Sequence, residues 1–268
     1  MRSANPALNV FESGEFGVES TDIKTMTYFG TATKVGALIG LCAAAAVFAW
    51  QSMVVPAFTS GSVGSLLWWW LGLGIATFVI AIGVSFLPKA APVLAPLGAA
   101  TQGGTLAILS GFIASRYLGD VAIAGGAAEG LIFQAITLTF AIGGGLAICF
   151  AAGLARVNGT VAKIAIVMAA GVAVYFVAIV ICNWFLGMNL PNLFSEASPL
   201  GIAFSAFLLV LASIFLVLDF QAVEAGVEHR MPKHYEWVGG FAIVLTLAWI
   251  YIEVLRLLGK IRTVMGDD

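Results

Sequence analysis

Charged residues are scarce in this chain of 268 residues, which has 12 lysines and arginines, 14 aspartates and glutamates, and 61% hydrophobic residues. A soluble domain has about 25% charged residues, whereas this chain has 10% and cannot cover a water-facing surface. The composition therefore excludes a soluble enzyme and a disordered regulator. Because the net charge is −2 and there is no basic stripe, we also expect no nucleic acid as a partner.

Cysteine and histidine are also rare. The three cysteines, Cys42, Cys149 and Cys182, lie in apolar runs without the CxxC spacing of a metal site, which excludes a disulfide scaffold and predicts buried free thiols. Both histidines, His229 and His234, fall in one segment between apolar runs, so an intramembrane serine–histidine dyad would lack its base. No HExxH motif is present. We therefore expect no enzyme activity, no catalytic residue and no cofactor.

Long apolar runs dominate what is present, and they predict an all-α integral membrane protein with seven transmembrane helices. Each run is long enough to cross a hydrocarbon core of about 30 Å, and helices satisfy their own backbone groups in lipid. The expected spans are Val35–Val55, ended by Pro56, then Ser65–Leu87, Val93–Leu118, Leu131–Leu154, Val161–Leu186 and Pro199–Phe220, with the seventh inside Val238–Val264. We divide the chain into a cytosolic N-terminal tail, residues 1–33, and a membrane domain, residues 34–268.

Lysine and arginine are unevenly distributed around these spans. With a cytosolic N-terminus, seven of them lie near span ends on the cytosolic side and one, Arg116, lies outside, which favours that orientation. The seven are Lys24, Lys34, Lys89, Arg156, Lys163, Arg230 and Lys233. The last segment departs from the pattern, because Arg256, Lys260 and Arg262 fall toward its outer end. The sequence leaves open whether this segment spans fully or re-enters the membrane.

Glycine is abundant, with 31 residues. Gly36 and Gly40 form a GxxxG motif in the first span, and Gly143, Gly144 and Gly145 run together in the fourth. Small residues let helix backbones approach closely where lipid provides no hydrophobic driving force. We therefore expect these glycines to lie at contacts between helices; the alternative is that they line a narrow, deformable path between the helices.

Ionisable groups inside the spans concentrate in the last quarter of the chain, and such groups are costly in a membrane and mark function by default. Asp219 lies near the end of the sixth span, where it is either an interfacial carboxylate or part of a site. Glu253 lies in the last segment, with Arg256 three residues later on the same helix face. Glu253 either forms a local ion pair with Arg256 or shares one proton with Asp219. A shared pair would sense pH near neutrality and, when deprotonated, would offer oxygen ligands that suit Ca²⁺.

Contact between Asp219 and Glu253 depends on where the last helix begins. A straight helix that began at Glu236 would carry Glu253 about 25 Å along its axis, at about 1.5 Å per residue. The polar and glycine-containing stretch of residues 230–240 permits a later start. Contact between the acids therefore requires a helix that enters the membrane near Ala242.

Five segments of the C-terminal part of the sequence form a recognisable pattern: Leu218–Phe220, Glu224–Gly226, Pro232–Lys233, Glu236–Trp237 and Trp249–Leu258. In these segments the chain resembles the Bax inhibitor-1 family, and in residues 1–6 at its N-terminus it looks most like the bacterial branch of that family. The resemblance extends over nearly the whole chain, including residues 134–140 in the fourth span. It implies a seven-helix fold in which the last helix is central between two three-helix layers. We expect a monomer in the lipid bilayer of the bacterial inner (cytoplasmic) membrane.

The function that this resemblance implies is a pH-sensitive Ca²⁺ leak gated by a carboxylate pair, and the matching positions are Asp219 and Glu253. Glu253 stands where well-studied bacterial relatives carry aspartate. Those relatives have an arginine on the second span that this chain lacks, which leaves Arg256 as the nearby basic residue. Gln102 stands where the family has a glutamate. We assign Asp219 and Glu253 as the pH-sensing and metal-binding residues for Ca²⁺ and protons, with Arg256, Glu224 and Gln102 in support.

Two other functions stay open at this point. Some bacterial relatives resemble regulators of a membrane-bound AAA protease that act through the N-terminal tail, and residues 1–33 would serve that role. A proton-coupled cation exchanger would use the same two acids. Deleting the tail separates the leak from the regulator, because flux would survive the deletion whereas regulation would not.

Overall fold

The computed structural model describes residues 25–188 and 192–266. Within these residues, seven helical segments are long and apolar enough to cross a membrane, which confirms the predicted fold class. The elements are α2 (Tyr28–Ala49), η1 (Trp50–Val54), α3 (Val55–Ser60), α4 (Gly64–Phe86), η2 (Pro88–Ala90), α5 (Ala91–Leu118), α6 (Asp120–Ala124), α7 (Ala127–Ala151), α8 (Gly159–Val180), η3 (Ile181–Phe185), α9 (Pro199–Glu228) and α10 (Tyr235–Gly266).

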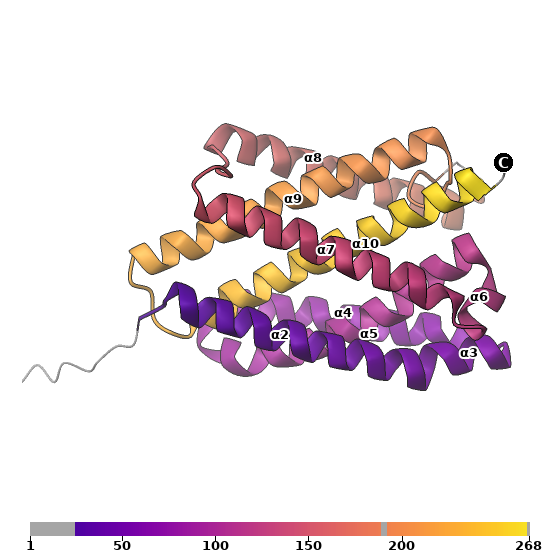
Figure 1. Ribbon diagram of the computed structural model, residues 1–268, viewed down its shortest axis with the longest axis horizontal. Helices are drawn as coiled ribbons and strands as arrows, with labels where there is room; N and C mark the ends of the chain where they lie inside the picture. Colours follow the sequence, from indigo (N-terminus) through magenta and orange to yellow (C-terminus); the bar gives the residue numbers. More distant parts are fainter. Residues whose placement is uncertain (1–24, 189–191, 267–268) are drawn as a thin grey trace, which may run out of the picture.

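The spans form two layers with the last helix between them (Figure 1). One layer holds α2, α4 and α5, and the other holds α7, α8 and α9. Helix α10 runs between the layers and packs against α9, α5, α2 and α7, whereas α8 packs mainly against α9. This is the central last helix that the family resemblance implies.

The first span begins earlier than predicted. Helix α2 starts at Tyr28, inside the predicted tail, because the side chain of Thr27 caps it by accepting a hydrogen bond from the N–H of Gly30. Residues 1–24 of that tail lie outside the described residues.

Pro56 does not end the first span, contrary to the prediction. The helix passes through the π-helical turn η1 and continues as α3 to Ser60, with Pro56 in the first turn of α3. A proline ring clashes with the preceding turn of a regular helix and lacks an N–H donor. The wider π-helical turn just before Pro56 changes that local geometry, so the span extends without a break.

Helix α10 is one uninterrupted helix of 32 residues, which at 1.5 Å per residue is about 48 Å long. This length exceeds a hydrocarbon core of about 30 Å. The last segment is therefore long enough to cross the membrane completely, and it lacks the break in the helix that a re-entrant segment would need. It also begins at Tyr235, before the late start near Ala242 that contact between the two acids would require.

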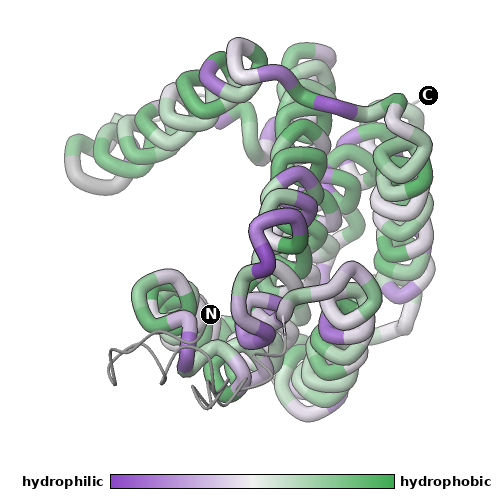
Figure 2. The backbone as a smooth tube through the Cα atoms, turned by 90° about the vertical axis from the view of Figure 1, so that its left-hand side faces the viewer, coloured by the Kyte–Doolittle hydropathy of each residue, from purple (hydrophilic) through white to green (hydrophobic). Residues whose placement is uncertain are grey.

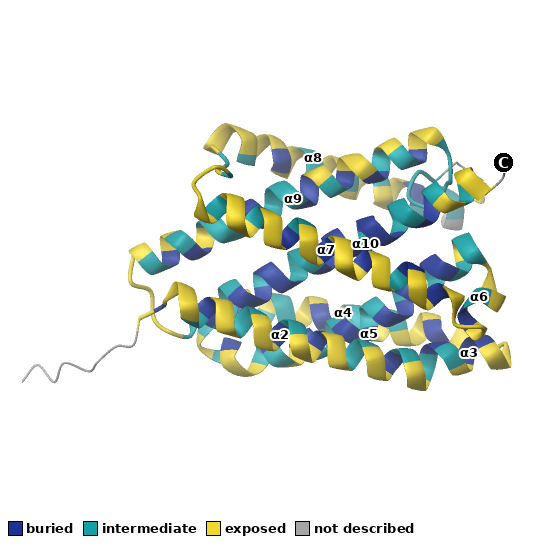
Figure 3. Ribbon diagram, viewed as in Figure 1, coloured by how far each residue is buried: buried dark blue, intermediate teal, exposed yellow. Residues whose placement is uncertain are grey.

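The most buried spans are α5 and α10, as the dark blue positions along them show (Figure 3). Small residues on the buried face of α5 let α2 and α4 approach closely. They are Ala91, Ala95, Gly98, Ala99, Gly103, Gly104, Ala107 and Gly111. The approach is closest at Gly103, where a Cβ would overlap with the backbone carbonyl oxygen of Cys42 on α2.

The predictions for glycine and cysteine are confirmed only in part. Gly143 lies at a helix contact as predicted, since a Cβ there would meet Leu247 of α10 at 2.7 Å. A Cβ on Gly36, Gly40, Gly144 or Gly145 would have no neighbour within 4 Å among the described residues, so the GxxxG motif packs against no other helix in that part of the chain. All three cysteines are free, but Cys42 is buried whereas Cys149 is exposed on the outer face of α7.

Hydrophilic residues gather toward the helix ends and connections, whereas the helix shafts are mostly hydrophobic (Figure 2). The start of α2, the end of α9 and the start of α10 lie at one end of the bundle, together with the connection between α7 and α8 (Figure 1). Lys34, Arg156, Arg230 and Lys233 belong to these segments. The end of α10, with Arg256 and Lys260, lies at the opposite end.

Candidate functional site

Asp219 lies on α9 and faces α10. Its Oδ2 accepts a hydrogen bond of 2.5 Å from the hydroxyl of Thr246, and its side chain is half-buried between the two helices. The antiparallel hairpin of α9 and α10 fixes this pairing, because Asp219 and Thr246 lie at similar distances from the connecting turn. No lysine or arginine among the described residues forms an ion pair with Asp219. A neutral hydroxyl is thus its only hydrogen-bond partner there.

Glu253 lies deeper along α10 and is almost fully buried, with 2% of its surface exposed. Its Oε1 accepts a hydrogen bond of 2.9 Å from Nη1 of Arg256, which is the i to i+3 pair that the sequence allowed. Its Oε2 has no hydrogen-bond partner among the described residues. The guanidinium of Arg256 also lies 5.3 Å from the centre of the Phe194 ring, a cation–π contact.

Asp219 and Glu253 are not brought together, which corrects the expectation of a shared-proton pair. Asp219 contacts Thr246, and Glu253 follows Thr246 by seven residues, or about 10 Å of helix. The reason is the hairpin register, because α10 starts at Tyr235 and passes Asp219 two turns before it reaches Glu253. The two acids therefore stand at different depths along α10.

The supporting residues lie in three separate places. Glu224 binds Arg156 through two hydrogen bonds of 2.8 Å each, which ties the end of α9 to the connection between α7 and α8 and raises the pKa of Arg156. Gln221 reinforces this tie through the backbone of Val157. Gln102 is half-buried on α5, next to Gly103, where α5 approaches α2 most closely. Of the three supporting residues, only Arg256 contacts one of the two acids, Glu253.

Lys260 is a buried polar residue whose position the sequence analysis missed. Its side chain is fully buried, and its ammonium donates to the carbonyl oxygens of Leu193 and Gly201, at 2.7 and 2.9 Å, and to the hydroxyl of Ser205, at 2.8 Å. These three contacts join the end of α10 to the start of α9 and to the segment before it. The sequence did contain an indication that Lys260 is buried, because Glu253, Arg256 and Lys260 recur at helical spacing and so share one face of α10.

No group of three or more histidine, cysteine, aspartate or glutamate side chains that could hold a metal occurs in the described part of the chain. Ca²⁺ prefers six to eight oxygen ligands. Asp219, with the hydroxyl of Thr246, offers three side-chain oxygens, which is fewer than a permanent Ca²⁺ site requires.

The model of the family described as "Bax inhibitor 1 like" matches residues 5–263, nearly the full length of the chain. No curated protein and no solved structure matches the chain.

Proposed function

We propose that this chain, which belongs to the Bax inhibitor 1 like family, is a pH-sensitive leak for cations, Ca²⁺ in particular. Its seven apolar spans make it a multi-pass membrane protein. In this proposal Asp219 and Glu253 are the proton-sensing acids, and they act at two successive depths along α10. The membrane is the bacterial inner membrane.

The observation that carries the proposal is the setting of Asp219. A carboxylate inside apolar helices needs a proton or a cation to offset its charge. The residues described around Asp219 supply a hydroxyl from Thr246 and no basic side chain. The counter-charge must then come from the solution, as a proton or as a cation that follows α10. Competition between the two makes cation passage depend on pH.

Glu253 has a different role in the proposal, because Arg256 already neutralises it. The pair is local, and Glu253 keeps one oxygen without a hydrogen-bond partner in the described structure. A passing cation can compete with Arg256 for that carboxylate. We therefore assign Glu253 as the second acid of the path and Arg256 as its resident counter-ion.

Asp219→Asn is expected to remove most of the pH dependence of Ca²⁺ flux into proteoliposomes. Asparagine can still accept a hydrogen bond from Thr246 but cannot titrate, so one proton-binding step is lost. Flux through the variant should be nearly constant over the range in which the wild type responds. Glu228→Gln is the matched control, because Glu228 is an exposed acid at the end of the same helix. A pH–flux curve unchanged by Asp219→Asn would exclude Asp219 as a gate.

The same assay separates the two explanations for Glu253. We expect Glu253→Gln to abolish pH-gated flux, and we expect no recovery when Arg256→Gln is added, because the acid of the path is still missing. Recovery of wild-type, pH-dependent flux in the double variant would instead assign the two residues to a neutral local pair.

We also propose that the N-terminus is cytosolic. The bundle end that holds the start of α2 also holds most of the basic residues, which favours that end as the cytosolic one. Cysteines introduced at Ser3 and at Asn192, which precedes α9, should react with an impermeant maleimide from opposite sides of the membrane. Labelling of both from one side would contradict the seven-span topology.

A further inference from the structure

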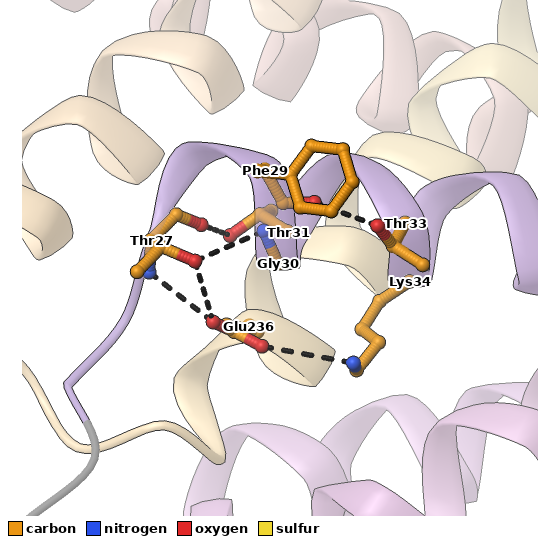
Figure 4. A network of polar contacts seen from close by, with 7 residues as sticks. All are labelled: Thr27, Phe29, Gly30, Thr31, Thr33, Lys34 and Glu236. Carbon is orange, nitrogen blue, oxygen red and sulfur yellow. Dashed lines mark hydrogen bonds and ion pairs between the residues drawn. The ribbon is translucent and has the colours of Figure 1, made fainter.

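A buried carboxylate from α10 holds the start of α2 (Figure 4). Oε1 of Glu236 accepts hydrogen bonds from the backbone N–H of Thr27, at 3.2 Å, and from its hydroxyl, at 3.0 Å. The same hydroxyl accepts from the N–H of Gly30, at 2.9 Å, and so caps α2. Oε2 of Glu236 lies 3.7 Å from the ammonium of Lys34, one turn further along α2. The first turns of two helices far apart in sequence are thus joined by one side chain.

The packing around this carboxylate is tight. Glu236 has none of its surface exposed, and a Cβ on Gly30 would overlap with its carboxylate. The position therefore requires glycine at residue 30 if the acid is to stay in place. Figure 4 shows Glu236 aimed at the first turn of α2, with Thr27 on one side and Lys34 on the other.

The chain just before α2 is held at the same place. Thr25 forms an antiparallel bridge with Pro232 in the connection between α9 and α10, and the N–H of Met26 donates to the carbonyl of Met231 at 2.7 Å. The side chain of Met26 is buried and packs against Gly226, where a Cβ would lie 2.9 Å from its sulfur. We call Thr25, Met26, Thr27, Lys34 and Glu236 the N-terminal clasp. Residues 1–24 join the membrane domain through it.

The clasp acts on the helix that carries the proposed path. Glu236 lies in the first turn of α10, ten residues before Thr246, the partner of Asp219. A continuous helix transmits a displacement along its axis. Burial of a carboxylate is costly, and here the cost is offset only in part, because Oε1 accepts two hydrogen bonds from one residue whereas Oε2 has no hydrogen-bond partner in the described structure and lies 3.7 Å from the ammonium of Lys34.

We propose that the N-terminal clasp is a regulatory latch: when residues 25–27 are drawn away from α10, Glu236 is released, α10 shifts relative to Asp219, and the leak increases. The latch itself stands on the contacts above. Its effect on flux rests on the proposed leak function, so the two are tested separately.

The latch is tested first by exposure of residue 26. In a Met26→Cys protein, the new thiol should react slowly with an impermeant maleimide while the clasp is closed. Adding Glu236→Gln should speed that reaction about tenfold, because opening becomes easier. Glu228→Gln, an exposed acid at the same end of the bundle, should leave the rate unchanged. Rates are taken relative to protein that keeps Met26, which corrects for the three native cysteines.

An equal labelling rate with and without Glu236→Gln would overturn the latch. Where Glu236→Gln does not give folded protein, Lys34→Met provides the same test, because it removes the ion pair, together with the cation–π contact of Lys34 with Trp237, and leaves both hydrogen bonds to Thr27 intact. That variant should also speed labelling, by a smaller factor.

The coupling to flux is tested by reversible locking. Thr25→Cys with Pro232→Cys places two thiols across an antiparallel bridge, where Cα atoms lie about 5 Å apart and a disulfide can form. Glu236→Gln should raise Ca²⁺ flux into proteoliposomes at constant pH, oxidation of the added pair should return it to the wild-type rate, and reduction should restore the increase. Faster labelling with unchanged flux would overturn the coupling. Absence of flux in the wild type would instead refute the leak function, and labelling would still decide on the latch.

Discussion

Replacing Gly103 by alanine is expected to destabilise the folded protein by about 3 kcal/mol, the upper end of what overpacking costs. The added methyl group would overlap with the carbonyl oxygen of Cys42, and a Cβ there would also lie 3.0 Å from Ala45 and from the backbone nitrogen of Ala46. These atoms belong to the shaft of α2, so they cannot move aside as a flexible side chain can. Helices α2 and α5 must then separate along the interface that holds together the layer of α2, α4 and α5.

Thermal unfolding in detergent, followed by circular dichroism, measures this effect. Gly40→Ala is the matched control, since it adds the same methyl group to α2, two residues before Cys42, where nothing lies within 4 Å. It should not lower the unfolding midpoint, because alanine favours a helix by about 1 kcal/mol over glycine and meets no neighbour here. Equal effects of the two substitutions would show that α2 and α5 do not cross as closely at Gly103 as described.

Lys260→Met is the second substitution with a large expected effect, a loss of about 2–3 kcal/mol, typical of breaking hydrogen bonds to a buried charged group. Methionine fills a similar volume but cannot donate to Leu193, Gly201 and Ser205, and those oxygens stay buried. The end of α10 would then lose its tie to the start of α9. We expect the chain around residue 193 to become more susceptible to limited proteolysis.

Two further variants make this test specific. Lys163→Met changes an exposed lysine on α8 and should have little effect. Ser205→Ala removes one of the three acceptors and should cost about 1 kcal/mol, the usual net value of one hydrogen bond. If Lys260→Met were no more harmful than Lys163→Met, the three contacts would not stabilise the protein.

The apolar runs were sufficient for the span count, because segments that cross lipid must be helices, and the family resemblance supplied the central position of the last helix. The sequence was not sufficient to predict how far along the helix bundle a single residue lies. Asp219 and Glu253 are both acids in neighbouring helices, but their contact depends on hairpin register, which the start of α10 at Tyr235 sets. That start follows from local turn geometry, which composition does not reveal.

The same limit explains why Lys260 and Glu236 were overlooked. Each lies near the end of an apolar run, where a charged residue normally faces water. Their burial depends on partners far away in the sequence, Ser205 for Lys260 and Thr27 for Glu236. The prediction for Gly36 and Gly40 was wrong in the opposite direction. Their GxxxG motif is typical of helix contacts, but here both glycines face outward.

The order in which the helices are made has a consequence for how α10 enters the membrane. As an isolated helix, α10 would carry Glu253, Arg256 and Lys260 into hydrocarbon, at a cost that translocon scales place at about 2.5–3.5 kcal/mol for each lysine or arginine near the helix centre. Its partners α2, α5, α7 and α9 all precede it in the chain. The acceptors for Lys260 are therefore synthesised before the lysine itself, and the described helix with the most charged residues follows its partners into the bilayer.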